Sequence, residues 1–481
     1  YESVPKERRA RLHLRFADWL EQRDPGADAM LGHHLGQAWR YAGELGDDAP
    51  ARAELGRRAA THLVPAAEAA IARSAVPAAV ALFGQAAAME PSGSVEHVDA
   101  LVELGAALLT AGRLDESEAA LADAEAAARA GGHARGRAHA GVLRLQVALQ
   151  VDPGPALARI PAVTARAAGT FARGGDELGM CRVEHTRALA HWFAGRCQSA
   201  GEAWERAASH ARRGSLEWAL PDMLAWVASS LQLGPEPVPQ AIVRCERLRE
   251  ETQSHPLWQA FVMRPLGLLY AMNGELERSR AVFAECDRLL DEMGETIHSA
   301  APDREAEAAL LEGDAARAER LLRDGFDRLE AMGDRAQLSL IATLLARAVE
   351  EQGRADEAFE LSLVGERFAI HEDVCAQVIW RTVRARALAS RGSTADAERL
   401  AREAVELAAG TDWLIGRGDA AFTLGVALFA SGAETEAYQA WSEALSFYEH
   451  KGAVVSVVSM RAAIDARIAT GAPNGRARHT I

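Results

Sequence analysis

The 481-residue chain has few cysteines, almost no lysine and no long apolar run. Its five cysteines stand far apart without a CxxC pair, which favours reduced thiols over a disulfide framework. No run of about 18 apolar residues occurs, so no transmembrane helix is expected. Arginine supplies nearly all the positive charge, because lysine occurs only at Lys6 and Lys451. The net charge of −15 disfavours binding to a phosphate backbone, and we expect a cytoplasmic protein with no direct nucleic-acid or membrane partner.

Strand signals are nearly absent as well. Apolar residues recur three and four positions apart, as in Leu101, Leu104 and Leu108, which is the periodicity of an amphipathic helix. Turn residues recur at intervals of about 40 residues, and such a period with one central turn predicts two helices per unit. The predicted fold is all-α, an α-solenoid of about ten helix-turn-helix repeats forming a superhelix. The turns are placed at Ser74, Gly112, Gly154, Gly195, Gly234, Gly274, Gly313, Gly353, Gly392 and Gly432.

Small residues flank these turns at fixed offsets. The residue seven positions before the turn is small, as at Ala306 and Gly425, and so is the residue five positions after it, as at Ala318 and Ala437. Small side chains let the two helices of a hairpin approach closely. A larger residue nine positions after the turn, such as Trp441, is expected to fill the space under the next unit.

This pattern resembles the tetratricopeptide repeat, whose usual period is about 34 residues. The resemblance covers residues 51–470, and the units around Gly154 and Gly234 depart from it with proline-rich turns. We therefore predict a repeat domain over 51–470, a helical junction over 1–50 and a flexible basic tail over 471–481.

The junction carries a second resemblance. The segments VPKERRARLHLRFADWLE and LGHHLGQAWRYAGELG are similar to the region that follows the winged-helix part of actinobacterial AAA/STAND-type signalling ATPases. In that family the ATPase module precedes a long helical-repeat region, and many members also carry a class III adenylate or guanylate cyclase domain or a LuxR-type DNA-binding domain. The matching residues are Pro5, Arg9, Leu12, His13, Phe16, Ala17, Trp19, Leu20, Gly32, His34, Leu35, Gln37, Ala38, Arg40 and Tyr41.

The catalytic parts of that family do not occur in this sequence. No GxxxxGK[ST] loop is present, so ATP and Mg²⁺ are expected only in an upstream module, and no cofactor or catalytic residue is expected here. The chain starts with Tyr1 instead of Met, which we interpret as a piece of a longer protein.

Two groups of histidines invite a metal-site interpretation. His33 and His34 are adjacent and point about 100° apart on a helix, so they do not readily share a metal, and we expect one to pack and one to be solvated. Cys181 and His185 lie four residues apart on one face, with another His and Cys nearby. A zinc site needs three or four convergent ligands. Packing is therefore the leading interpretation, with metal binding as the alternative for the second group.

First helices of such repeats usually line the concave face of the superhelix. We therefore predict a groove for a peptide, protein or small effector that includes Arg182, His185, Trp192, Arg264 and Arg386. The alternative is that these amphipathic side chains are half-buried at helix contacts. Acidic runs such as EAEAALLEGD at 305–314 are interpreted as solvated helix faces.

Three functions remain open at this point. The leading hypothesis is a non-catalytic sensor or scaffold arm of a STAND-type ATPase regulator, which binds a protein or effector and acts on an upstream ATPase module in cis. The second is a fragment of an ATP-binding enzyme, a cyclase or ATPase, whose catalytic domains lie upstream. The third is a free-standing scaffold.

Overall fold

The computed structural model describes residues 4–46, 49–293, 302–332 and 335–470, and within these ranges every regular element is a helix. The predicted all-α repeat fold is thereby confirmed. The chain forms two compact units, of which unit 1 comprises residues 1–187 and 206–220, and unit 2 comprises residues 188–205 and 221–481. The predicted tail at 471–481 lies outside the described residues. None of the helices described combines the length and apolar character needed to cross a membrane.

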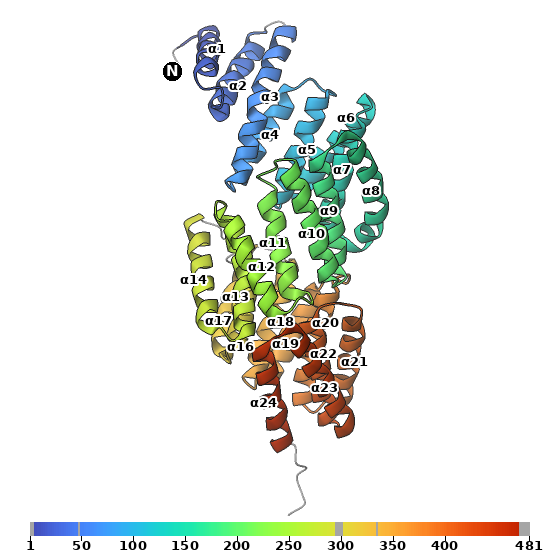
Figure 1. Cartoon of the computed structure of the whole chain (residues 1–481). Coiled ribbons are helices and arrows are strands. Elements are labelled where there is room, and N and C mark those ends of the chain that lie inside the picture. The colour runs from blue at the N-terminus through green and yellow to red at the C-terminus, as the bar shows by residue number, and fades with distance from the viewer. Residues whose placement is uncertain (1–3, 47–48, 294–301, 333–334, 471–481) are drawn as a thin grey trace, which may run out of the picture. The chain divides into compact units, whose positions relative to one another are not determined.

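Helices follow one another as antiparallel hairpins (Figure 1). Unit 1 contains α1 (Lys6–Arg23), α2 (Asp28–Leu45), α3 (Ala49–Ala72), α4 (Val76–Met89), α5 (Val95–Thr110), α6 (Leu114–Gly131), α7 (Ala134–Val151) and α8 (Pro153–Gly174). Both units share α9 (Glu177–Phe193) and α10 (Cys197–Arg213). Unit 2 continues with α11 (Leu220–Leu233), α12 (Val238–Glu251), α13 (Pro256–Asn273), α14 (Leu276–Met293), α16 (Asp303–Leu311), α17 (Ala315–Met332), α18 (Arg335–Glu351), α19 (Ala355–Phe368), α20 (Val374–Ser390), α21 (Thr394–Ala409), α22 (Leu414–Ala430), α23 (Glu434–Lys451) and α24 (Val454–Thr470).

The predicted junction does not stand apart from the repeats. Leu20 of α1, Leu31 and Leu35 of α2, and Leu63 of α3 lie in one buried cluster. Residues 4–46 therefore pack directly on the first repeat, and the division into two units comes much later in the chain, within α9 and α10.

Most of the predicted turns fall where the sequence places them. A residue with positive φ closes the first helix at Ser74, Gly112, Gly195, Gly274, Gly313, Gly353, Gly392 and Gly432. Glycine is favoured there because a Cβ atom is disfavoured in the left-handed region. The placement at Gly154 was wrong, because α8 already begins at Pro153 and only Asp152 separates it from α7. Proline at the first helical position explains this early start.

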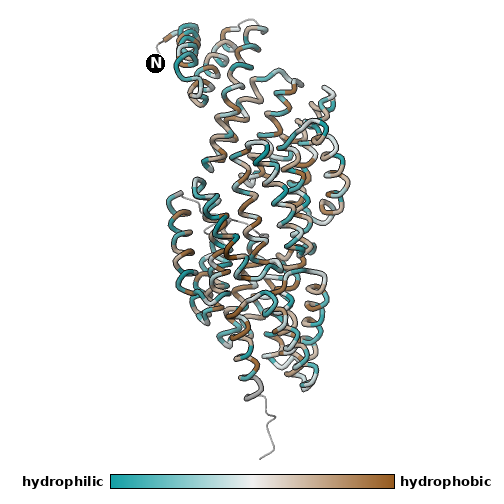
Figure 2. The backbone as a smooth tube through the Cα atoms, viewed as in Figure 1, coloured by the Kyte–Doolittle hydropathy of each residue, from teal (hydrophilic) through white to brown (hydrophobic). Residues whose placement is uncertain are grey.

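The small residues flanking the turns do permit close helix contact. An added Cβ at Gly425 would lie 2.3 Å from Cδ1 of Trp441, so the indole ring occupies the space that a side chain on α22 would need. The residue nine positions after the turn therefore packs on the residue seven positions before it, in its own hairpin. The same arrangement joins Gly105 to Leu121 and Gly267 to Phe283. Figure 2 shows apolar and polar residues interspersed along the helices.

Unit 2 closes on itself through two contacts between its early hairpins, α9 to α12, and its late hairpins, α20 to α23. The fully buried Lys451, at the end of α23, donates from Nζ to the carbonyl oxygens of Leu231, Gly234 and Glu236 at 3.0, 2.6 and 2.8 Å. These three carbonyls belong to the end of α11 and the α11–α12 turn, more than 200 positions earlier in the chain. The proline-rich turn at Gly234 is thus held by a distant lysine.

The second contact caps a helix from a distance. The Asp412 carboxylate accepts hydrogen bonds from the backbone N–H groups of Cys197 and Gln198 at 2.7 and 3.0 Å. These groups are the first amides of α10, where a carboxylate satisfies otherwise unpaired donors and complements the helix dipole. Further along, α24 contacts α13 and α16. We call this closed array of unit 2 the ring.

Candidate functional site

The ring encloses a cavity of about 720 Å³. Its lining comes mainly from the first helices of the hairpins, namely α9, α11, α13, α16, α18, α20, α22 and α24. The second helices take almost no part, with Cys197 of α10 as their contribution. The volume lies in the range typical of small-molecule pockets.

The five predicted groove residues do not converge on one site. Trp192, Arg264 and Arg386 line this cavity. Arg182 and His185 belong to unit 1 and do not line it. Arg182 is buried in an ion pair 2.6 Å from Glu103 and hydrogen-bonded to His139 at 3.0 Å.

His185 occupies a comparable interior position. Burial lowers the pKa of this imidazole to about 4, so the ring is neutral at physiological pH. The residues of this part of α9 therefore serve the interior of unit 1, while Trp192, less than two turns later, faces the cavity of unit 2.

Aromatic rings form one wall of the cavity. The ring of Trp226 lies 5.5 Å from that of Trp192 and stacks at 4.9 Å on the fully buried Trp204. On α13, Trp258 and Phe261 also line the cavity, with their rings 5.5 Å apart. Offset and edge contacts of this kind hold large apolar surfaces in fixed orientations.

Charged side chains form another wall, and several of them are mutually paired. Asp303 bridges Arg264 and Arg304, and its Oδ2 lies 3.1 Å from Nη1 of Arg304. Arg347 lies 3.8 Å from the carboxylate of Asp419, which also accepts a hydrogen bond from the Tyr448 hydroxyl. Arg386 pairs with Glu350. Each of these arginines comes from a different first helix.

Two carboxyl groups in the cavity have strongly perturbed acidity. Burial raises the pKa of Glu307 to about 7, and the nearby Asp303 adds to this effect. Burial likewise raises the pKa of Asp222 to about 7. Both groups therefore exchange protons near neutral pH, as groups in ligand sites often do.

The interpretation of residues 305–314 as a solvated acidic face was wrong. Glu307 lines the cavity, and Glu305 pairs with Arg317 at 2.5 Å. The side chain of Glu312 is only 6% exposed and lies between Arg280 and Arg317. The sequence periodicity did not reveal this, because the carboxylates are paired with arginines of other helices, Arg317 on α17 and Arg280 on α14.

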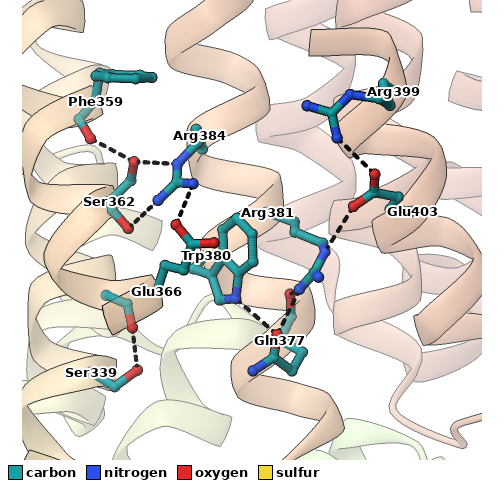
Figure 3. Close-up of polar contacts among 11 residues, drawn as sticks. Ser339, Phe359, Ser362, Glu366, Gln377, Trp380, Arg381, Arg384, Arg399 and Glu403 are labelled. Carbon is teal, nitrogen blue, oxygen red and sulfur yellow. Dashed lines mark hydrogen bonds and ion pairs between the residues drawn. The ribbon is translucent and has the colours of Figure 1, made fainter. Parts of the chain in front are cut away.

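Polar contacts anchor α20 to its neighbouring helices α19 and α21 (Figure 3). The buried Arg384 donates from Nε and Nη2 to the hydroxyl and carbonyl oxygens of Ser362 at 3.0 and 2.8 Å, and from Nη1 to Glu366 at 2.6 Å. A second chain of contacts, which includes Arg381 and Glu403, ties α20 to α21. These contacts fix the helix that presents Arg386 to the cavity.

The histidine pair of α2 behaves as a packing feature. His33 is exposed, whereas His34 lies with its Nδ1 2.8 Å from Nδ1 of His13 and its ring 4.5 Å from that of Phe16. Burial lowers the pKa of His13 and of His34. Among the residues with a described structure, no three His, Cys, Asp or Glu side chains are grouped so that they could hold a metal ion.

Comparison with solved structures defines the fold. Over 99% of this chain and 95% of the other, the fold is similar to Cut9 in the APC/C hetero-tetramer Cut9-Hcn1, with a TM-score of 0.52 at 12% identity. It is also similar to a Rap protein complexed with Competence and Sporulation Factor, over 72% of this chain and 100% of the other, with a TM-score of 0.50 at 15% identity. The chain has a tetratricopeptide-like repeat fold. No family model and no curated protein matches the sequence.

Proposed function

We propose that this chain is a binding module that receives a protein, peptide or small effector in the cavity of unit 2. The observation that carries this proposal is the lining of that cavity by the first helices of successive hairpins, with aromatic and charged walls. A surface assembled from many repeats is typical of solenoids that bind partners. Both similar folds were captured in complexes, with Competence and Sporulation Factor and with Hcn1.

We further propose that this chain is the sensor or scaffold arm of a STAND-type ATPase regulator. Support comes from the resemblance of residues 4–46 to the segment that follows the winged-helix part of such proteins. Ligand binding in the ring would shift the equilibrium between two conformations of the whole regulator. A ligand shifts such an equilibrium only when it binds one conformation more tightly than the other. The alternative is a fragment of a cyclase or ATPase. The genomic sequence upstream of Tyr1 separates both from a free-standing scaffold, because both need an upstream GxxxxGK[ST] loop or cyclase domain that a scaffold lacks. A cyclase domain ahead of that loop would favour the cyclase alternative.

The binding role is tested by filling the cavity. Ala376 lines it, so Ala376→Trp should abolish retention of a partner identified by mass spectrometry with the unaltered chain as bait. Ala395→Trp, at an exposed position on α21, is the matched control and should retain the partner. Equal retention by both variants would exclude the cavity as the binding surface.

A further inference from the structure

Four arginines reach the cavity from four successive first helices. They are Arg264 on α13, Arg304 on α16, Arg347 on α18 and Arg386 on α20, and we call them the arginine wall. Each has an acidic partner, because Asp303 serves the first two, Asp419 and Glu351 serve Arg347, and Glu350 serves Arg386.

The acidic partners leave much of the donor capacity unused. A guanidinium carries five N–H donors. Arg304 donates one hydrogen bond to Asp303, and Arg386 donates one to Glu350. The Nε atoms of both are buried with no hydrogen-bond partner in the described part of the chain. Arg384, two residues from Arg386 on the same helix, has all three nitrogens bonded, so on α20 the unpaired donor belongs to Arg386.

Unused buried donors favour an acceptor-rich ligand. A buried donor without a partner is costly, and a carboxylate or phosphate group satisfies several guanidinium N–H groups at once. The side chains of Arg304 and Arg386 line the cavity and keep 18% and 15% exposure.

The remaining acids in the cavity do not cancel this preference. Asp303 and Asp419 are engaged with arginines, and Asp373 accepts a hydrogen bond from the N–H of Ala376 as the N-cap of α20. Glu307 and Asp222 each have a pKa of about 7 and are therefore partly neutral at physiological pH. The charge available to a ligand on this wall is thus mainly positive.

The aromatic wall supplies the second half of the site. Trp192, Trp226, Trp258 and Phe261 line the same cavity, and on α13 Phe261 lies three residues before Arg264. Residues three apart on a helix are neighbours on its surface. An apolar body can therefore lie against the aromatic rings while its acidic group reaches the arginine wall.

We propose that the ring of unit 2 binds a small amphipathic organic anion, whose acidic group is received by Arg304 and Arg386 and whose apolar body packs on Trp192, Trp226 and Trp258. This inference rests on the proposed function, because it names the class of ligand for the same cavity. The recognised chemistry is an acid group joined to a compact apolar body.

Glu307 makes such binding sensitive to pH. It faces Asp303 and Arg304 on its own helix, Arg347 on α18 and Asp419 on α22. An ionised Glu307 repels a bound anion, whereas the protonated carboxyl does not. Affinity for the anion should therefore rise as pH falls through about 7. Asp222 lines the same cavity and also has a pKa of about 7, so Glu307→Gln should reduce this dependence and keep the affinity high, and adding Asp222→Asn should remove the remainder.

The first experiment compares two dyes on the full chain. The anionic 8-anilinonaphthalene-1-sulfonate is titrated against neutral N-phenyl-1-naphthylamine, which has the same ring systems but lacks the acid group, with energy transfer from the cavity tryptophans as the signal. The anion should bind at least about tenfold more tightly, the effect of one charge-assisted hydrogen bond. Equal affinities would overturn the anion inference while leaving a binding cavity in place.

The second experiment locates the acid group. Arg304→Gln and Arg386→Gln should each weaken binding of the anionic dye by about tenfold, with unchanged helical circular dichroism. Arg399→Gln is the matched control, because Arg399 is an exposed arginine paired with Glu403 on α21, and it should bind normally. Unchanged binding in both cavity variants, or equal loss in the control, would refute the assignment.

Competition identifies the source of the acid group. Dodecanoate should displace the bound dye at concentrations about tenfold lower than dodecanol does, and an acetylated tetraglutamate peptide should not displace it. Displacement by the peptide alone would overturn the choice of a small organic anion. The cavity-filling test of the proposed function uses a protein partner and does not depend on these dyes, so the two proposals can fail separately.

Discussion

Replacing Lys451 with methionine tests whether one buried ammonium closes the ring. The substitution keeps a long unbranched side chain but removes the donor to the carbonyl oxygens of Leu231, Gly234 and Glu236. Unit 2 should therefore lose the link between the end of α23 and the α11–α12 turn.

The expected loss follows from two opposing terms. Burial lowers the pKa of Lys451 from 10.5 to about 8, so holding the charged form inside costs roughly 3 kcal/mol near neutral pH. Three hydrogen bonds from a charged donor, at about 1.5–3 kcal/mol each, outweigh that cost. We expect Lys451→Met to lower the free energy of unfolding by about 2–5 kcal/mol at pH 7.

The pH dependence has a defined sign. Between pH 8 and 10.5 the lysine keeps its proton in the unfolded chain but loses it in the folded one, so the unfolded state binds more protons and stability rises with pH. The stability difference between the natural chain and the variant should widen over this interval by up to about 3 kcal/mol. The neighbouring thiols of Cys197 and Cys245 have pKa values raised by burial to about 12 and stay protonated there.

Urea unfolding followed by tryptophan fluorescence from pH 7 to 10 measures both effects. Hydrogen exchange at residues 231–236 assigns the change to the α11–α12 turn, and Lys6→Met, at an exposed ion pair with Glu44, is the control. A loss below about 0.5 kcal/mol at pH 7, or a difference that stays constant up to pH 10, would refute the role assigned to Lys451.

Three further predictions follow from packing and capping. Gly425→Ala should lower the free energy of unfolding by about 1–3 kcal/mol, because its Cβ would overlap Trp441. Gly141→Ala on α7, which has open space around it, should instead raise the free energy of unfolding by about 0.5–1 kcal/mol. Thermal denaturation of the two variants measures both effects. Asp412→Ala should destabilise unit 2 by about 1–2 kcal/mol and expose the first amides of α10, from Cys197 onward, to hydrogen exchange; normal protection there would contradict the cap. The cysteines are buried or nearly so, and thiol reagents at pH 8 should react with them far more slowly than in urea; fast labelling of the folded chain would be inconsistent with these positions.

The sequence alone determined the local architecture of this protein. Helical periodicity, the turn residues near every fortieth position and the small residues flanking them depend on contacts within one hairpin. Those contacts join residues that are close in the sequence. Gly425 and Trp441, for example, lie 16 positions apart, and their spacing recurs in other hairpins and can be recognised from the sequence. The assignment of first helices to the inner surface came from the resemblance to tetratricopeptide-like superhelices, and Trp192, Arg264 and Arg386 do line the cavity.

The tertiary structure alone decided which side chains share a site. Arg182 and Trp192 lie on one helix but serve different units, and Lys451 meets its acceptors more than 200 positions away. Glu307 looked like a surface carboxylate because its own segment does not reveal that Arg347 of α18 and Asp419 of α22 face it. Periodicity reports how a helix packs on its neighbours in the chain. How the repeats curve back depends on small rotations accumulated over many hairpins, and these are not encoded at any single position.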